Sequence, residues 1–210
     1  MAQQDEKDDL EILGTERLYD GFTQLVRSTA RHRKRDGTWS RSYQREVLLP
    51  GLAVAVLPYD PELDRVVLIE QQRVPAWYAG LPTRMVETVA GLAKPDEAPE
   101  EVARRELQEE AGVVARDMVE VADFLPSPGS TAARLKLFYA TVDASEAGGW
   151  FGLEEEDEEV RAFPATVQEI AELVESGKIH NGTTLIALQW FLLNHKSLQA
   201  KRLPQALAAP

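Results

Sequence analysis

The sequence contains no cysteine and has fewer basic than acidic residues. Without cysteine there can be no disulfide framework, no thiolate zinc site and no cysteine nucleophile. The 23 lysines and arginines stand against 35 aspartates and glutamates, which gives a formal net charge of -12. This balance argues against a general nucleic-acid-binding protein, because backbone phosphates require clustered basic side chains. An anionic ligand would therefore need a local positive group, either clustered arginines or a bound cation.

Long apolar segments are also missing. No run of about 18 apolar residues, the length expected of a membrane helix, occurs in the chain. The N-terminal stretch MAQQDEKDDLEILG is acidic, whereas a secretory signal would be basic and then apolar. We therefore expect a cytoplasmic protein that neither crosses a membrane nor binds nucleic acid. Its 210 residues, 44% of them hydrophobic, suit one globular domain with a small appendage.

The hydrophobic pattern predicts an α/β or α+β sandwich, because strands in the middle of the chain alternate with and precede helices. The stretch GLAVAVLPYDPELDRVVLIEQQR has β-branched runs on both sides of a turn at Asp60, which predicts a hairpin. The segments METVAGL and LKLFYATV predict further strands. Helices are expected over residues 97–111, 165–176 and 183–195, the first with Pro99 in its first turn and Gly112 at its end.

These elements suggest four segments: a flexible N-terminus (residues 1–14), a small β subdomain (15–47), the main domain (48–197) and a C-terminal tail (198–210). The β subdomain is too short and too weakly apolar to hold a core alone. We therefore expect it to pack against another surface.

The stretch RRELQEEAGV places several carboxylates on one side of the first expected helix. Glu106, Glu109 and Glu110 fall within an arc of about 100°, and like charges one turn apart cost roughly 0.2–0.5 kcal/mol per pair. Arg105 stands one turn from both Glu101 and Glu109 and could pair with either. The residues alone leave two readings, a solvated amphipathic helix or a carboxylate site for Mg²⁺ or Mn²⁺.

The spacing around this helix resembles the Nudix box, GX5EX7REUXEEXGU, in which U is an aliphatic residue. Every specified position is matched from Gly91 to Val113. The resemblance implies a Nudix hydrolase with an α/β/α sandwich fold, which uses Mg²⁺ or Mn²⁺ to cleave the pyrophosphate of a nucleoside diphosphate linked to another group. By this resemblance the metal ligands would be the carbonyl of Ala90 and the carboxylates of Glu106, Glu109 and Glu110. Gly91, Glu97, Arg105 and Gly112 would have structural roles in the loop and helix.

Other stretches are similar to the ADP-ribose pyrophosphatase subfamily of Nudix hydrolases. These are VVLIEQQR, METVAG, SPGST with Pro128, GLEEEDEEV and SGKIHNGTTLIALQWFL. The resemblance implies a homodimer that hydrolyses ADP-ribose to AMP and ribose 5-phosphate. The implied substrate-binding residues are Arg45, Arg73, Glu87, Ser127, Gly129, Thr131 and Arg134. A surface ion pair is the alternative for Arg73 and Arg134.

The catalytic base is expected outside the acidic helix, because a carboxylate committed to a cation is a poor proton acceptor. The acidic stretch from Glu154 to Glu159 follows several glycines, which would allow a loop to move over the substrate. The resemblance points to Glu158 as the base, acting beside Glu106 and Glu110. Glu155, Glu156 and Glu159 are the alternatives, and without the resemblance this stretch reads as a solvated acidic loop.

The Nudix box indicates the reaction but leaves alternatives for the substrate. A small nucleoside diphosphate sugar is the expected partner, and GDP-mannose is an alternative to ADP-ribose. A non-catalytic module that senses ADP-ribose is a further alternative, but it would have no need of the intact carboxylate set.

Overall fold

The computed structural model describes residues 9–200, apart from the side chain of Glu156. The described residues form two compact units, divided at Gly51 and at the segment Ser127–Arg134. Unit 1 contains the chain up to Gly51 together with Ser127–Arg134, and unit 2 contains Leu52–Pro126 and the chain from Leu135 onward. The sequence pattern predicts residues 127–134 as part of the main domain. They group with unit 1 because Leu48 donates its amide to the carbonyl of Ser130 at 3.0 Å and accepts the amide of Ala132 at 2.9 Å.

Unit 1 is built on a three-stranded sheet in the order β1-β2-β3. The strands are β1 (Leu10–Asp20), β2 (Gln24–His32) and β3 (Tyr43–Leu49). The expectation of a flexible terminus up to residue 14 is wrong for residues 10–14, because pairing with β2 extends β1 back to Leu10. Residues 1–8 and 201–210, the rest of the two expected tails, lie outside the described part.

Unit 2 contains a sheet of eight strands in the order β10-β11-β5-β4-β9-β8, with β6 paired to β5 and β7 to β4. The hairpin expected around Asp60 is confirmed, since its carboxylate accepts the amides of Glu62 and Leu63 in the turn between two antiparallel strands. The strands are β4 (Leu52–Asp60), β5 (Arg65–Gln72), β6 (Arg84–Glu87), β7 (Val89–Leu92), β8 (Asp117–Phe124), β9 (Arg134–Thr141), β10 (Gly149–Phe151) and β11 (Val160–Thr166).

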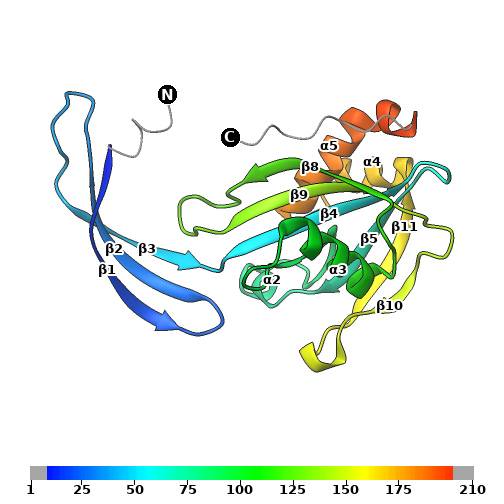
Figure 1. Ribbon diagram of the computed structural model, residues 1–210, viewed down its shortest axis with the longest axis horizontal. Coiled ribbons are helices and arrows are strands. Elements are labelled where there is room, and N and C mark those ends of the chain that lie inside the picture. Colours follow the sequence, from blue (N-terminus) through cyan, green and yellow to red (C-terminus); the bar gives the residue numbers. More distant parts are fainter. Residues whose placement is uncertain (1–8, 201–210) are drawn as a thin grey trace. The chain divides into compact units, whose positions relative to one another are not determined.

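Helices cover both faces of this sheet (Figure 1). They are α2 (Val74–Tyr78), α3 (Pro99–Ala111), α4 (Val167–Glu175) and α5 (Gly182–Gln199), with a 3₁₀ helix, η1, over Glu154–Glu156. Val102 and Leu107 of α3 pack in the core on one face, and Ile170, Leu188 and Phe191 of α4 and α5 pack in the core on the other. The expected α/β/α sandwich is therefore confirmed.

The three expected helices are present with shifted ends, and α5 continues to Gln199. The sequence pattern does not predict α2, β8, β10, β11 or η1. No helix in the described part of the chain is long and apolar enough to cross a membrane.

Candidate active site

Helix α3 begins and ends where local sequence requires. Pro99 occupies its first position, and Glu101 accepts the amide of Ala98 at 3.2 Å. At the other end, Gly112 adopts a left-handed conformation with φ of 64°. A side chain at Gly112 would also meet the ring of Phe151 at 2.4 Å. These ends fix the register in which the helix presents its glutamates to β7.

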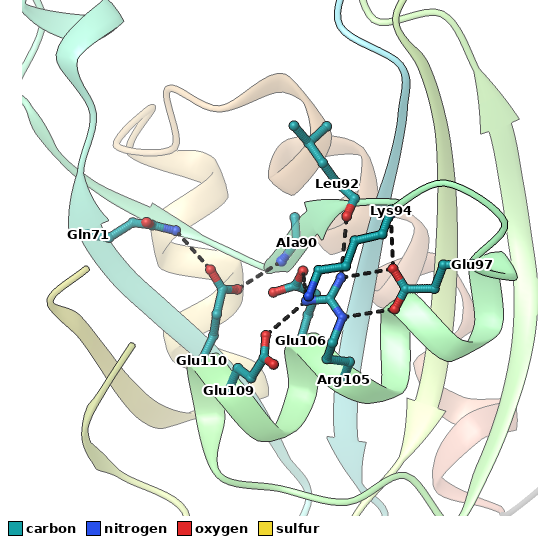
Figure 2. Close-up of polar contacts among 9 residues, drawn as sticks. All are labelled: Gln71, Ala90, Leu92, Lys94, Glu97, Arg105, Glu106, Glu109 and Glu110. Carbon is teal, nitrogen blue, oxygen red and sulfur yellow. Dashed lines mark hydrogen bonds and ion pairs between the residues drawn. The ribbon is translucent and has the colours of Figure 1, made fainter. Parts of the chain in front are cut away.

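Arg105 lies among these glutamates and pairs with Glu106 and Glu109, which offsets part of their mutual repulsion (Figure 2). Its Nη1 donates to Glu106 at 2.6 Å and to Glu109 at 2.9 Å. Its Nε donates to Glu97 at 2.9 Å, and this hydrogen bond is the main reason that the pKa of Glu97 falls to about 2. Arg105 does not pair with Glu101 as an alternative partner, because the Glu101 carboxylate instead reaches back to the amide that precedes α3.

Glu110 is the most buried carboxylate of the cluster, with 3% of its surface exposed. It accepts the amide of Ala90 at 3.0 Å and the side chain of Gln71 at 3.4 Å (Figure 2). Burial raises the pKa of Glu110 to about 8 and is also the main cause that raises the pKa of Glu106. Glu106 lies directly against Gly91, where a Cβ would be 1.8 Å from Glu106 Oε1. Glycine at position 91 thus makes room for the Glu106 carboxylate.

The donor chemistry of this cluster fits a hard divalent cation. The expected ligands, the carbonyl of Ala90 and the carboxylates of Glu106, Glu109 and Glu110, offer oxygen alone. Burial still raises the pKa values of Glu106 and Glu110, although the positive charges of Arg105 and Arg73 oppose these shifts. As placed, however, no three acidic or histidine side chains in the described part could hold an ion together. Glu106 and Glu109 would have to exchange Arg105 for the ion as their partner.

The acidic loop is tied to α3 at Gly152, whose amide donates to the carbonyl of Glu109 at 3.1 Å. Gly152 has φ of 107°, and a Cβ there would lie 2.6 Å from the backbone oxygen of Glu158. Glu158 is half-buried, whereas Glu155 and Glu159 are exposed. Its negative charge contributes to the pKa shifts of Arg73, Glu106 and Glu110. Among the alternative bases, the side chain of Glu156 lies outside the described part.

Arg73 and Glu87 form an ion pair beside the acidic cluster, with Arg73 Nη2 2.7 Å from Glu87 Oε2. Both line a pocket of about 610 Å³ whose apolar wall includes Leu81, Phe124 and Ile186. A volume of this size is typical of small-molecule sites. The ion pair expected as the alternative for Arg73 is therefore present, with Arg73 39% and Glu87 2% exposed, and substrate contact by Arg73 stays a prediction.

The remaining expected substrate-binding residues belong to unit 1. The guanidinium of Arg45 lies 4.8 Å from the ring centre of Tyr43, and its Nη1 donates to the carbonyl of Gln44 at 2.8 Å. Arg134 is exposed at the start of β9. A pocket of about 470 Å³ within unit 1 is lined by His32, Tyr43, Arg45, Val47, Pro128, Gly129, Ser130 and Thr131. Ser127 precedes this lining, and substrate contact by these residues stays a prediction.

Two polar residues of unit 2 that contact Glu87 are not predicted from the sequence. Gln71 and Asn181 both donate to the carboxylate of Glu87, at 3.4 and 2.8 Å. Asn181 is 94 positions from Glu87 in the chain. Neither residue carries a local signal, because an amide side chain at a strand end or a helix start is common in any fold.

Comparison with known proteins places the chain in a family. The NUDIX domain model matches residues 49–185, so the chain belongs to the Nudix family. It is 41% identical over 193 residues to a protein named ADP-ribose pyrophosphatase from Escherichia coli K12, covering 92% of each chain. It is 39% identical to the protein of that name from Haemophilus influenzae, covering 91% of this chain and 89% of the other.

Two more distant matches bear on substrate and fold. The chain is 33% identical to a GDP-mannose pyrophosphatase from Enterobacter sp. strain 638, covering 88% of this chain and 96% of the other. The crystal structure of an ADP compounds hydrolase matches with a TM-score of 0.67 and 20% identity, covering 93% of this chain and 97% of that one. This likeness agrees with the Nudix fold.

Proposed function

We propose that the protein is a divalent-cation-dependent hydrolase that converts ADP-ribose to AMP and ribose 5-phosphate. The observation that carries this proposal is the buried carboxylate of Glu110, which helix α3 presents together with Glu106 and Glu109 as a set of oxygen donors that suits a divalent cation. The names of the relatives at 41% and 39% identity support ADP-ribose as the substrate.

The chain's own side chains suit pyrophosphate hydrolysis. Mg²⁺ or Mn²⁺, when bound by Glu106, Glu109, Glu110 and the carbonyl of Ala90, would neutralise phosphate charge. The Arg73 guanidinium, held by Glu87, is available to bind a phosphate oxygen. Glu158 would take a proton from the water that attacks one phosphorus atom, while the bond from that phosphorus to the bridging oxygen breaks and the other phosphate leaves.

Substrate choice can be tested with ADP-ribose and GDP-mannose in parallel assays, with products separated by chromatography. We expect Mg²⁺-dependent formation of AMP, with kcat/KM for ADP-ribose at least about tenfold higher than for GDP-mannose, or about 1.4 kcal/mol of discrimination. Turnover in excess EDTA serves as the control. A higher kcat/KM for GDP-mannose would identify GDP-mannose as the substrate in place of ADP-ribose. Binding of ADP-ribose without product formation would favour a non-catalytic sensor.

We further propose that the protein is a homodimer. Several apolar side chains of unit 1 are exposed, including Ile12 at 54%, Tyr19 at 63% and Phe22 at 92%. A three-stranded sheet with such a surface is stabilised by burying it against another surface. Light scattering should give twice the chain mass of 23.4 kDa. A fully active monomer at assay concentration would contradict this proposal.

A further inference from the structure

Glu87 is a buried carboxylate that is held from several sides. It ends β6 and is 2% exposed. Arg73 contacts it through two nitrogens, since Nη2 lies 2.7 Å and Nε 3.0 Å from Oε2. A charge buried this deeply must be paired and hydrogen-bonded, because desolvation otherwise outweighs any attraction. The orientation of the Glu87 carboxylate therefore also sets the orientation of the Arg73 guanidinium.

Asn181 supplies the shortest contact to the other oxygen of Glu87. Its Nδ2 donates to Glu87 Oε1 at 2.8 Å. The Oδ1 of the same side chain accepts the amide of Thr184 at 3.0 Å and so caps the start of α5. One amide group thus fixes Glu87 to the end of an 18-residue helix. This second role, beyond capping, is available only to a side chain that accepts with one atom and donates with the other.

The pair of Arg73 and Glu87 is electrostatically connected to the acidic cluster. Gln71 Nε2 lies 3.4 Å from both Glu87 Oε2 and Glu110 Oε1. The charges of Glu110 and Glu158 both act on Arg73. Within the described part, Arg73 uses Nε and Nη2 for its side-chain hydrogen bonds to Glu87, which leaves Nη1 for a further acceptor.

We propose that Asn181 is a positioning residue that holds Glu87 and thereby aims Arg73 at a phosphate of the substrate. This inference rests on the proposed function, because it requires a substrate with a phosphate beside the acidic cluster. Without the Nδ2 donor, Glu87 can rotate, and Arg73 follows it because the two are joined by several hydrogen bonds. A guanidinium that is ordered before binding loses less entropy when the phosphate arrives. Arg73 would contribute the same binding free energy to the bound substrate and to the transition state. Loss of its ordered position therefore raises KM more than it lowers kcat.

The substitution Asn181→Asp separates the two roles of the side chain. Aspartate has the same shape and is as good a cap as asparagine, but in its ionised form it replaces the Nδ2 donor by an acceptor. We expect KM for ADP-ribose to rise about tenfold, with kcat within about threefold of the parent enzyme. The matched control is Asn194→Asp on the same helix, which also removes an Nδ2 hydrogen bond of 2.8 Å, in this case to the carbonyl of Trp190. The control should leave KM unchanged.

A double-mutant cycle with Arg73→Ala identifies the group through which Asn181 acts. If Asn181 works through Arg73, adding Asn181→Asp to Arg73→Ala should change KM by less than about twofold. Asn181→Ser is carried through the same cycle, because serine also caps the helix, has no amide donor and, unlike aspartate, has no carboxyl proton to share with Glu87. An equal rise of KM in both backgrounds would overturn the proposal, as would a normal KM in the folded Asn181→Ser protein.

The parent enzyme separates this inference from the proposed function. Failure of the parent to hydrolyse ADP-ribose would contradict the proposed substrate alone. The cycle would then be measured with the nucleoside diphosphate sugar that the parent hydrolyses, and its outcome would decide the role of Asn181 independently.

Discussion

Replacement of Glu110 by glutamine is expected to lower kcat for ADP-ribose about a thousandfold, or about 4 kcal/mol of barrier. Glutamine keeps the shape of the side chain and an oxygen that can accept the amide of Ala90, but it removes the negative charge. With 3% of its surface exposed, Glu110 has little water to stabilise that charge. A divalent cation would compensate the negative charge of Glu110. The affinity of the protein for the cation should therefore fall when glutamine removes that charge.

The same substitution should not weaken the metal-free fold. Burial raises the folded-state pKa of Glu110 from 4.5 to about 8. The stability contributed by this group is therefore fully present below pH 4.5 and is lost as the pH rises to about 8. Glutamine does not ionise and avoids this loss. The measured quantity is the melting temperature of Glu110→Gln minus that of the parent, both in EDTA. This difference should be larger at pH 8 than at pH 5.

The experiment combines steady-state kinetics in saturating Mg²⁺ with scanning calorimetry in EDTA. The matched control is Glu100→Gln in the first turn of the same helix, where the carboxylate is exposed and pairs with Arg104 at 2.8 Å. We expect the control to keep its activity, because an exposed ion pair contributes little. Hydrolysis by Glu110→Gln within about tenfold of the parent rate would contradict the role assigned to this carboxylate.

The elements predicted well from sequence are those whose signals are local. Pro99 and Gly112 predict the two ends of helix α3, and the turn at Asp60 predicts the hairpin of β4 and β5. Helix α2 was missed because it has only five residues, too few to show a periodic pattern. The grouping of residues 127–134 with unit 1 was missed for a different reason. It depends on backbone hydrogen bonds of Leu48 with Ser130 and Ala132, which any residue type except proline could make.

In the candidate site, too, the features with a local signal could be predicted from the sequence, and those that depend on the fold could not. The spacing of Glu106, Glu109 and Glu110 on one helix could be read directly, since i, i+3 and i+4 positions share a face. The partners of Arg105 could be read only in part, because its bond to Glu97 joins residues eight positions apart, across the loop that precedes α3. The hydrogen bond of Asn181 to Glu87 joins segments that only the folded sheet brings together.

The second large loss of activity is expected for a substitution in the acidic loop. Glu158→Gln should lower kcat for ADP-ribose about a hundredfold or more, within the range by which general bases accelerate reactions. Glu158 is half-buried in a loop whose other described glutamates are exposed, and its charge acts on Arg73 and Glu110. Glutamine keeps the size of the side chain but cannot accept a proton from water. KM and the dependence on Mg²⁺ should change little, because substrate and cation are held by other residues.

This selective loss can be measured by steady-state kinetics together with calorimetric titration of the substrate. Glu146→Gln, an exposed glutamate in the loop before β10, is the matched control and should behave as the parent. A fully active Glu158→Gln beside an inactive variant of Glu155, Glu156 or Glu159 would move the base to that residue. If all four variants are active, the base lies outside this loop. A rise in KM equal to the fall in kcat/KM would instead assign Glu158 to substrate binding, because an interaction made equally in substrate and transition state leaves kcat unchanged.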